Sequence, residues 1–196
     1  GDKVTPFPLF TGIPNRGLAI ATLRVEVVPS LEEVPAAAWN ALAGTADPFL
    51  RHEFLHGLER HRCLDDHGWF PQHLLVLDGE RLVGALPLYV RDNSQGEFVF
   101  DWSWAEAYQR AGGRYYPKLV TAVPFTPVTG RRLLLADDTP DAARIAHTLV
   151  AGVRALAESL GASSWHCLFP ADGQLALLED SDLLRREGCQ YHWYNA

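Results

Sequence analysis

Two carboxylates stand inside an aromatic segment of this chain. Glu97 and Asp101 flank the apolar run 98–100. A charged group among apolar residues is costly unless it is paired, so such positions are more often sites than scaffold. If the segment is a strand, both acids lie on one face, where burial would raise their pKa values and let either act as a general base for an amine. Two interpretations without catalysis stay open: a salt bridge to Lys118 or Arg114, and a helix cap by Asp101.

A Tyr-Tyr-Pro turn follows shortly after the two acids. Its tyrosines, Tyr115 and Tyr116, precede Lys118 by only a few residues. Either hydroxyl could hydrogen-bond a substrate, and Tyr116 could return a proton to a leaving group. Lys118, held stiffly after a proline, could meet a carboxylate on a ligand, and Trp102 could line a pocket for an acyl chain or a sugar ring. The alternative is that the turn closes a strand end and packs.

Four of the eight histidines are considered as possible metal ligands. His52, His73, His166 and His192 include no pair spaced four apart on a helix with an acid between them. Cys167 follows His166 directly, so on a strand the two side chains face opposite ways and cannot form a catalytic dyad. We therefore expect structural histidines, no metal and no redox cofactor.

The elements that must position these residues are a mixture of predicted strands and predicted helices. A tight-turn pair, Asp78-Gly79, predicts a hairpin, and Ser30 followed by acids predicts a capped helix that continues to Ala43. Apolar spacing of three and four predicts a long helix that ends at Gly161. The expected strands are 23–28, 73–77, 81–90, 98–100, 119–125, 164–169 and 190–193. The expected helices are 30–43, 53–62, 104–110, 141–160 and 174–178.

Composition limits the classes of function. The chain has 196 residues, 47% of them hydrophobic, which is enough for one domain with a sizeable core. A net charge of −7 argues against a DNA-binding protein, and no apolar stretch is long enough to enter a membrane. Three cysteines without paired spacing fit a reducing compartment, so we expect a cytoplasmic protein. Residues 1–22 are expected to be a flexible arm or an expression remnant, and residues 23–196 a single domain.

Several blocks in order along the chain carry a family resemblance. They are Pro48-Phe49-Leu50-Arg51-His52-Glu53-Phe54-Leu55, Gly68-Trp69-Phe70-Pro71-Gln72-His73-Leu74, Ser94 to Trp102, Tyr115 to Leu119, and Val123 to Arg132. With them, the chain resembles the bacterial FemAB-like predicted N-acyltransferases, which are linked to peptidoglycan biosynthesis or recognition. The resemblance implies a GNAT-like α+β fold, with a mixed, mainly antiparallel central sheet and helices on both faces. It also implies that this domain is the first of a tandem pair.

The resemblance gives the loop before the long helix a specific interpretation. GNAT enzymes hold the pyrophosphate of CoA on backbone N–H groups at this point, which requires small residues. Here Thr129 and Gly130 would supply the backbone, and Arg131 and Arg132 would supply charged phosphate contacts. The alternative is a rigid turn with surface arginines. Thr126, at the start of the loop, is a candidate for substrate binding together with Trp102, Tyr115 and Lys118.

Two hypotheses follow. The first is an N-acyltransferase or aminoacyltransferase that moves an acyl group from an activated donor to an amine, with Glu97, Asp101 and Tyr116 as catalytic residues. Its donor would be acyl-CoA as co-substrate, or aminoacyl-tRNA, which the negative charge does not favour. The acceptor would be a small molecule or a cell-wall precursor. The second hypothesis is a non-catalytic half that recognises such a precursor, needs a second GNAT-like domain for activity, and exposes an apolar patch for it.

Overall fold

The computed structural model describes residues 23–188, which form two four-stranded sheets. In the first sheet the strands run in the order β1 (Leu23–Val28), β3 (His73–Asp78), β4 (Arg81–Leu86) and β7 (Leu134–Leu135). In the second sheet they run in the order β2 (Trp69–Pro71), β5 (Tyr89–Arg91), β6 (Lys118–Thr121) and β8 (Trp165–Cys167). Every pairing is antiparallel except β6 with β8.

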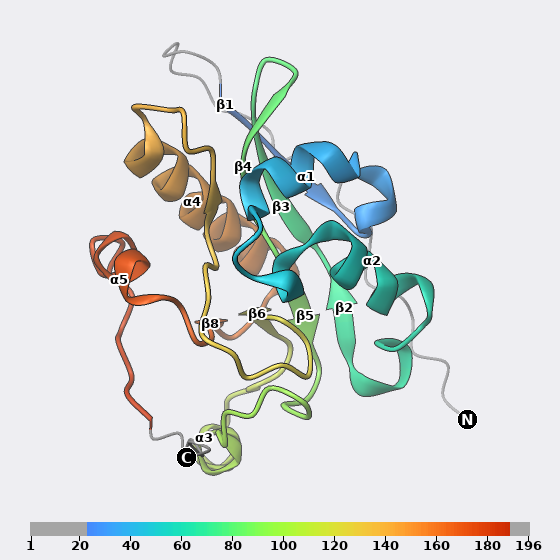
Figure 1. The fold of residues 1–196 in the computed structure, drawn as a ribbon. Coiled ribbons are helices and arrows are strands. Elements are labelled where there is room, and N and C mark those ends of the chain that lie inside the picture. The colour runs from blue at the N-terminus through green and yellow to red at the C-terminus, as the bar shows by residue number, and fades with distance from the viewer. Residues whose placement is uncertain (1–22, 189–196) are drawn as a thin grey trace, which may run out of the picture.

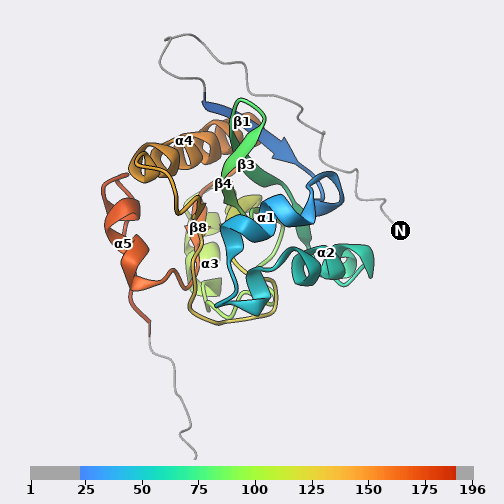
Figure 2. The ribbon, with the colours of Figure 1, turned by 45° about the horizontal axis from the view of Figure 1, so that its top comes forward.

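Helices cover both faces of the first sheet (Figures 1 and 2), which confirms the predicted α+β architecture. They are α1 (Ala36–Ala43), α2 (His52–Arg60), α3 (Trp102–Arg110), α4 (Ala142–Leu160) and α5 (Asp172–Glu179), with 3-10 turns η1 (Leu31–Glu33), η2 (Pro48–Leu50) and η3 (Asp65–His67). The long α4 lies on one side of β1, β3 and β4, and α1 lies on the other (Figure 2). Within the described part of the chain, no helix is both long and apolar enough to cross a membrane.

Local sequence signals placed the strongest elements well. The hairpin of β3 and β4 turns at Asp78-Gly79 as predicted. Helix α4 ends where Gly161 adopts a left-handed conformation, φ 61°, which agrees with the predicted end of the long helix. The strand at 23–28 is also confirmed. The strand predicted at 190–193 and the arm predicted at 1–22 lie outside the described residues.

Prolines explain two errors. The helix predicted from Ser30 to Ala43 is wrong, because Ser30 caps only the 3-10 turn η1 and the chain is extended at Val34 and Pro35 before α1 begins. The single strand predicted at 81–90 is also wrong. The chain leaves the first sheet after Leu86, at Pro87, and its continuation β5 belongs to the second sheet.

Two other predicted strands are shorter than expected, and one is absent. The runs 119–125 and 164–169 are strands only at Lys118–Thr121 and Trp165–Cys167. The strand predicted at 98–100 is wrong: these residues form an irregular loop in which Phe98 has a left-handed backbone, φ 57°. The cause of this irregular path lies in the side chains of the candidate site described below.

The second sheet is buried differently on its two faces. One face carries Val90 and Leu119, which belong to the main core shared with the first sheet. The other face carries a small separate core of Trp69, Tyr89 and Val120. Since neighbouring residues of a strand point to opposite faces, the charged side chains at positions 91 and 118 must lie on the side of the small core.

The contact between α4 and the first sheet provides a stability test. A Cβ atom added at Gly84 in β4 would lie 2.4 Å from Cγ2 of Ile145 in α4. We therefore expect Gly84→Ala to lower the free energy of unfolding by about 1–3 kcal/mol through overpacking. Urea denaturation measures the change. The control is Gly57→Ala in α2, where no atom lies within 4 Å of the added methyl group; it should be neutral or raise stability by up to ~1 kcal/mol. Equal effects of both substitutions would contradict the packing argument.

Candidate active site

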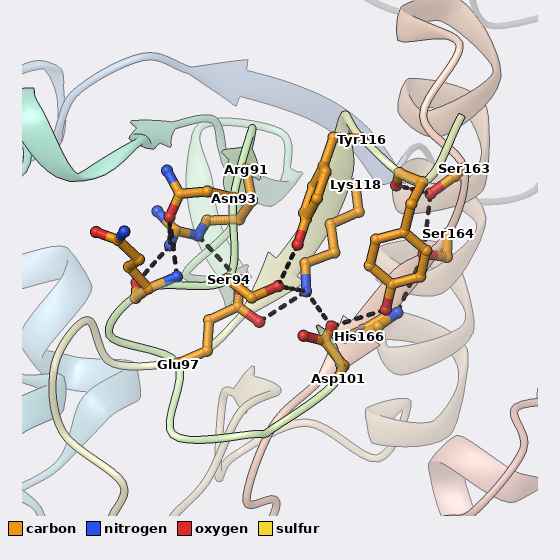
Figure 3. Close-up of polar contacts among 12 residues, drawn as sticks. Arg91, Asn93, Ser94, Glu97, Asp101, Tyr116, Lys118, Ser163, Ser164 and His166 are labelled. Atoms are coloured by element: carbon orange, nitrogen blue, oxygen red, sulfur yellow. Dashed lines mark hydrogen bonds and ion pairs between the residues drawn. The ribbon is translucent and has the colours of Figure 1, made fainter. Parts of the chain in front are cut away.

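Strand register gathers the polar residues on one face of the second sheet. Arg91 in β5 lies directly opposite Lys118 in β6, and Val120 lies opposite His166 in β8. Directly opposed residues share a face, and so do residues two apart along a strand. Arg91, Lys118 and His166 therefore project from the same side of the sheet. Figure 3 shows them together with residues of the loop that covers this face.

The ammonium group of Lys118 is the centre of this arrangement (Figure 3). Its Nζ donates to Oγ of Ser94 at 2.8 Å, to Oε2 of Glu97 at 2.8 Å and to Oδ2 of Asp101 at 2.6 Å. A lysine ammonium has three donors, and all of them are used here. The side chains of Lys118 and Glu97 are fully buried and that of Asp101 is 1% exposed. The loop is thus attached to β6 at three points.

Arg91 supports the same loop from the neighbouring strand. Its Nε donates to Oε1 of Glu97 at 3.0 Å, and its other nitrogens reach the carbonyls of His67 at 2.8 Å and Gln95 at 2.6 Å. The guanidinium carbon lies 3.8 Å from the centroid of the Trp69 ring, in a cation–π contact. Arg91 therefore fixes both the loop and the start of β2.

We call Arg91, Glu97, Asp101 and Lys118 the four-charge cluster. Two cations face two carboxylates, so the formal charges of these four buried side chains balance. Such a cluster adds little net stability compared with apolar packing, because four groups lose their hydration. Removal of one member, however, leaves a buried charge without a partner, which is strongly destabilising.

The loop between β5 and α3 has an irregular backbone, which positions these side chains and does not form a strand. Gly96 has φ 77°, and a Cβ atom there would lie 2.6 Å from Cδ1 of Phe125. The left-handed turn that follows directs Glu97 inward, while Phe98 and Phe100 are 51% and 77% exposed. Glu97 and Asp101 do share one side, as the sequence predicted, but through an irregular loop instead of strand alternation.

Asp101 stands at the start of α3 without capping it. Its side chain makes no cap hydrogen bond; Oδ2 accepts from Lys118 and from the Tyr115 hydroxyl at 2.7 Å, and Oδ1 is buried without a hydrogen-bond partner. Burial alone would raise the pKa of Asp101, but hydrogen bonds from Lys118 and Tyr115 lower it overall. The expectation of a raised pKa is therefore wrong for Asp101. It is an ionised carboxylate, and its buried Oδ1 accepts no hydrogen bond from the described residues.

The hydrogen bonds of the cluster continue to the hydroxyl of Tyr116. Oη of the half-buried Tyr116 lies 2.8 Å from Oγ of Ser94, which in turn accepts from Lys118. Tyr115 is directed inward instead: burial, and next its hydrogen bond to Asp101, raise its pKa. Of the two tyrosines predicted as site residues, Tyr116 is thus the less buried, and its hydroxyl contacts Ser94 instead of a carboxylate.

His166 lies at the edge of the same face as a neutral imidazole. Burial, and next the charge of Lys118, lower the pKa of His166 to about 4. Its Nε2 lies 3.1 Å from Oγ of Ser164, and its ring contacts Tyr115 with centroids 6.2 Å apart. The sequence predicted only a structural histidine here. No local pattern predicts its nearness to Lys118, which arises from the pairing of β6 with β8.

Arg91 and Ser94 were also missed as site residues. The sequence could have indicated Arg91, because this charged residue directly follows the apolar run 88–90. Nothing indicated Ser94, since a serine in a loop is ordinary.

The arginines of the loop before α4 bind backbone carbonyls. Arg131 donates to the carbonyls of Leu42 at 2.8 Å and Ala43 at 2.6 Å, and its side chain is 36% exposed. Arg132 is fully buried and donates to the carbonyls of Leu168 at 2.7 Å and Val128 at 2.6 Å. These bonds connect distant segments of the chain, so both side chains brace the loop.

The remaining loop residues do not join the four-charge cluster. The N–H of Gly130 donates to the carbonyl of Phe169 at 3.1 Å, and the hydroxyl of Thr126 donates to the carbonyl of Pro124 at 3.0 Å. Thr129 is exposed. The structure therefore brings Glu97, Asp101, Tyr115, Tyr116 and Lys118 together and leaves the loop 126–132 as a separate feature.

Trp102 belongs to an exposed aromatic patch. We define this patch as Phe98, Phe100, Trp102, Trp104 and Tyr108, which lie on the loop between β5 and α3 or on α3 itself. The rings of Phe100 and Trp102 are 5.8 Å apart, and Trp102 is 62% exposed. Its indole faces outward, away from the buried charges.

No metal-binding group emerges from residues 23–188. Within that range, the His, Cys, Asp and Glu side chains form no set of three or more that could hold an ion.

The comparisons with known proteins define first the class of fold. The described architecture matches the crystal structure of an aminoglycoside antibiotic 6'-N-acetyltransferase from Acinetobacter haemolyticus, with a TM-score of 0.52 and 14% identity, covering 88% of this chain and 99% of that chain. A ribosomal-protein-alanine N-acetyltransferase from Brucella melitensis gives a TM-score of 0.47 at 12% identity, covering 89% and 99%. The first of these matches shows the fold, which is that of GNAT-type N-acetyltransferases.

Sequence comparison then gives the family. The model of the FemAB-like family, described as peptidoglycan biosynthesis/recognition, matches residues 30–196. The chain belongs to the FemAB-like family. No curated protein matches its sequence. Family and fold together support a role of the acyltransferase type.

Removal of the central cation tests the cluster. Lys118→Met leaves Glu97 and Asp101 facing each other without their shared partner. We expect it to lower the free energy of unfolding by about 3–5 kcal/mol, as measured by urea denaturation at pH 7. The matched control is Arg81→Met, which breaks an exposed ion pair with Asp138 and should cost at most ~1 kcal/mol. Similar losses in the two variants would show that the cluster has no special weight.

The neutral state of His166 predicts a pH dependence. Because its pKa is about 4 in the folded protein and about 6.5 in the unfolded chain, the unfolded state takes up a proton first as pH falls. Stability from this group is fully present above pH ~6.5 and is lost toward pH ~4. We expect His166→Gln to lose about 1–3 kcal/mol less stability than the wild type between pH 7 and 4.5. Parallel pH profiles in urea denaturation would contradict the assignment.

Proposed function

We propose that this domain is an N-acyltransferase or aminoacyltransferase of the FemAB-like type. It would transfer an acyl group from an activated donor, acyl-CoA or aminoacyl-tRNA, to an amine, with a small molecule or a cell-wall precursor as acceptor. The observation that carries the proposal is the family match over residues 30–196, joined to a GNAT-type fold. A bacterial cytoplasm fits the proposal, since such donors are made there and the described thiols of Cys63 and Cys167 are free.

The four-charge cluster and the hydroxyl of Tyr116 offer the groups that the reaction needs. An attacking amine must lose a proton, and the leaving thiolate or alkoxide must gain one. In this proposal Glu97 or Asp101 takes up the proton, and Oδ1 of Asp101 is the carboxylate oxygen that has no hydrogen bond to a described residue. Tyr116 gives a proton to the leaving group and regains one through Ser94 from Lys118, and Lys118 in turn regains its proton from the carboxylate that took up the proton of the amine. Trp102 and Thr126 are kept as proposed substrate contacts, whereas Tyr115 and Lys118, whose polar atoms are bound inside the cluster, would hold the two acids in place.

The donor is proposed to lie along the loop from Thr129 to Arg132. This loop connects the second sheet to the long helix α4 through β7, and its position is fixed by the carbonyls that Arg131 and Arg132 bind. The buried guanidinium of Arg132 would act by holding the loop. Arg131, about one-third exposed, is the guanidinium that a donor phosphate can reach.

The role of Tyr116 tests the proposal. Thiol release from acetyl-CoA and longer acyl-CoAs is followed with a lysine-containing peptide as amine acceptor, and deacylation is followed for charged tRNA. We expect Tyr116→Phe to lower kcat by roughly 10–100-fold with little change in KM. The matched control, Tyr108→Phe, removes a hydroxyl from an exposed ring of the aromatic patch and should leave kcat unchanged. Failure of every donor with the wild type, or equal effects of both substitutions, would contradict the proposal.

The exposed aromatic patch favours a second candidate function. Large apolar side chains 47–77% exposed on one loop and one helix are typical of a surface that meets a partner. A non-catalytic half that recognises a cell-wall precursor, and that needs a second GNAT-like domain, would use such a patch. In that case both Tyr116 and Tyr108 variants would be inactive like the wild type, and turnover would appear only when a second domain is added.

A further inference from the structure

A cavity lies apart from the four-charge cluster, between η1, helix α2 and strand β2. Its volume is about 720 Å³, which is large enough for a small molecule. Glu59 from α2 and Ser30 line one part of it, and Leu64, Trp69 and Phe70 line another. The cavity thus combines one nearly buried carboxylate with apolar side chains, and the exposed charged residues Glu32, Arg60 and Asp65 also line it.

Glu59 receives its hydrogen bonds from neutral groups. Its Oε2 accepts from the hydroxyl of Ser30 at 2.8 Å and from the backbone N–H of Leu31 at 2.9 Å, while Oε1 lies 2.8 Å from Nε2 of His73. The side chain of Glu59 is 8% exposed and that of His73 is fully buried. Whether the carboxylate has a counter-charge therefore depends on the protonation of His73.

The other nitrogen of His73 settles that question. The backbone N–H of Leu88 donates to Nδ1 at 3.2 Å, so Nδ1 carries no proton and the proton resides on Nε2. The imidazole is therefore a neutral donor to Glu59. Glu59 accepts three hydrogen bonds, from the hydroxyl of Ser30, the N–H of Leu31 and Nε2–H of His73, and such a set of donors favours the ionised carboxylate.

The negative charge of Glu59 is thus left without a counter-ion in the described part of the chain. There, the only basic side chain with a nitrogen within 4 Å of its oxygens is the neutral His73. Arg60 also lines the cavity, but it is exposed and makes no such ion pair. A nearly buried carboxylate without a cation is costly, and the open space beside it can hold the group that balances it. The neighbouring Tyr89 hydroxyl, fully buried, is without a hydrogen-bond partner as well.

We propose that this cavity binds the ammonium group of a small amine, with Glu59 as its counter-ion and Leu64, Trp69 and Phe70 against its carbon chain. Oε1 of Glu59 accepts one hydrogen bond from His73 and has a lone pair left for the ligand. The aromatic walls suit an aliphatic or aromatic amine better than a hydrated metal ion. The inference does not rest on the proposed acyl transfer, because it concerns binding at a different set of residues.

The test compares a charged ligand with its neutral isostere. Pentylamine and pentan-1-ol are titrated at pH 7 into the 15N-labelled full chain, with sodium chloride as the inorganic cation. We expect saturable shifts of the Trp69 indole N–H and of the Ser30 and Arg60 amides with pentylamine. Binding of pentan-1-ol should be about tenfold weaker or more, as expected for loss of one buried charge contact. Sodium chloride should cause no saturable shift.

Two variants separate charge from fold. Glu59→Gln should abolish the preference for pentylamine over pentan-1-ol, while Glu53→Gln, an exposed glutamate on the same helix, should keep it. If Glu59→Gln does not fold by circular dichroism, the comparison of the two ligands with the wild type decides alone. Absence of shifts with pentylamine, equal binding of pentan-1-ol, or shifts confined to residues outside the cavity would overturn the proposal.

Discussion

The bridge that Lys118 makes between Glu97 and Asp101 determines how one whole side of this domain is built. The loop between β5 and α3 contains no strand, so little regular backbone pairing attaches it to the sheet. Side chains do this instead, through one ammonium on β6 and one guanidinium on β5. Because all four charges are out of water, the loop cannot move far without exposing an unpaired charge to an apolar surrounding.

That constraint also accounts for the exposed aromatic patch. The loop turns both acids inward, and the residues beside them are then directed outward. Phe98 accepts a left-handed backbone as part of this arrangement. The same contacts leave Oδ1 of Asp101 without a hydrogen bond inside the described part of the chain, and the Ser94 hydroxyl that Lys118 binds also contacts Tyr116. The contacts that attach the loop thus also fix the groups to which we assign proton transfer.

The sequence predicted what depends on near neighbours. The hairpin at Asp78-Gly79 and the long helix to Gly161 follow from turn chemistry and from apolar periodicity, and both were found. Errors arose where a proline interrupts a regular pattern, at Pro35 and Pro87. The GNAT-like fold itself came from the family resemblance, because the order of elements alone fits several architectures.

The candidate site was predicted in part, and for a partly wrong reason. Charges among apolar residues correctly marked Glu97, Asp101 and Lys118 as close together, but strand alternation was the wrong geometry and a raised pKa was wrong for Asp101. The bonds of Arg131 to Leu42 and Ala43 join residues 89 and 88 positions apart. No local pattern contains such information, since it depends on how whole elements pack.

The neutral tautomer of His73 likewise cannot be predicted from a local sequence pattern. It depends on a backbone N–H from the segment between β4 and β5 and on a carboxylate from α2. Only the assembled fold reveals that, among residues 23–188, the ionised Glu59 has no cationic partner within 4 Å.

A double-mutant cycle on Glu97→Gln and Lys118→Met tests the central claim most directly. If the two charges stabilise the loop jointly, their coupling in the free energy of unfolding should be about 2–3 kcal/mol. A coupling within ~0.5 kcal/mol of zero would mean that the two side chains act independently, and the account of this face of the domain would be wrong.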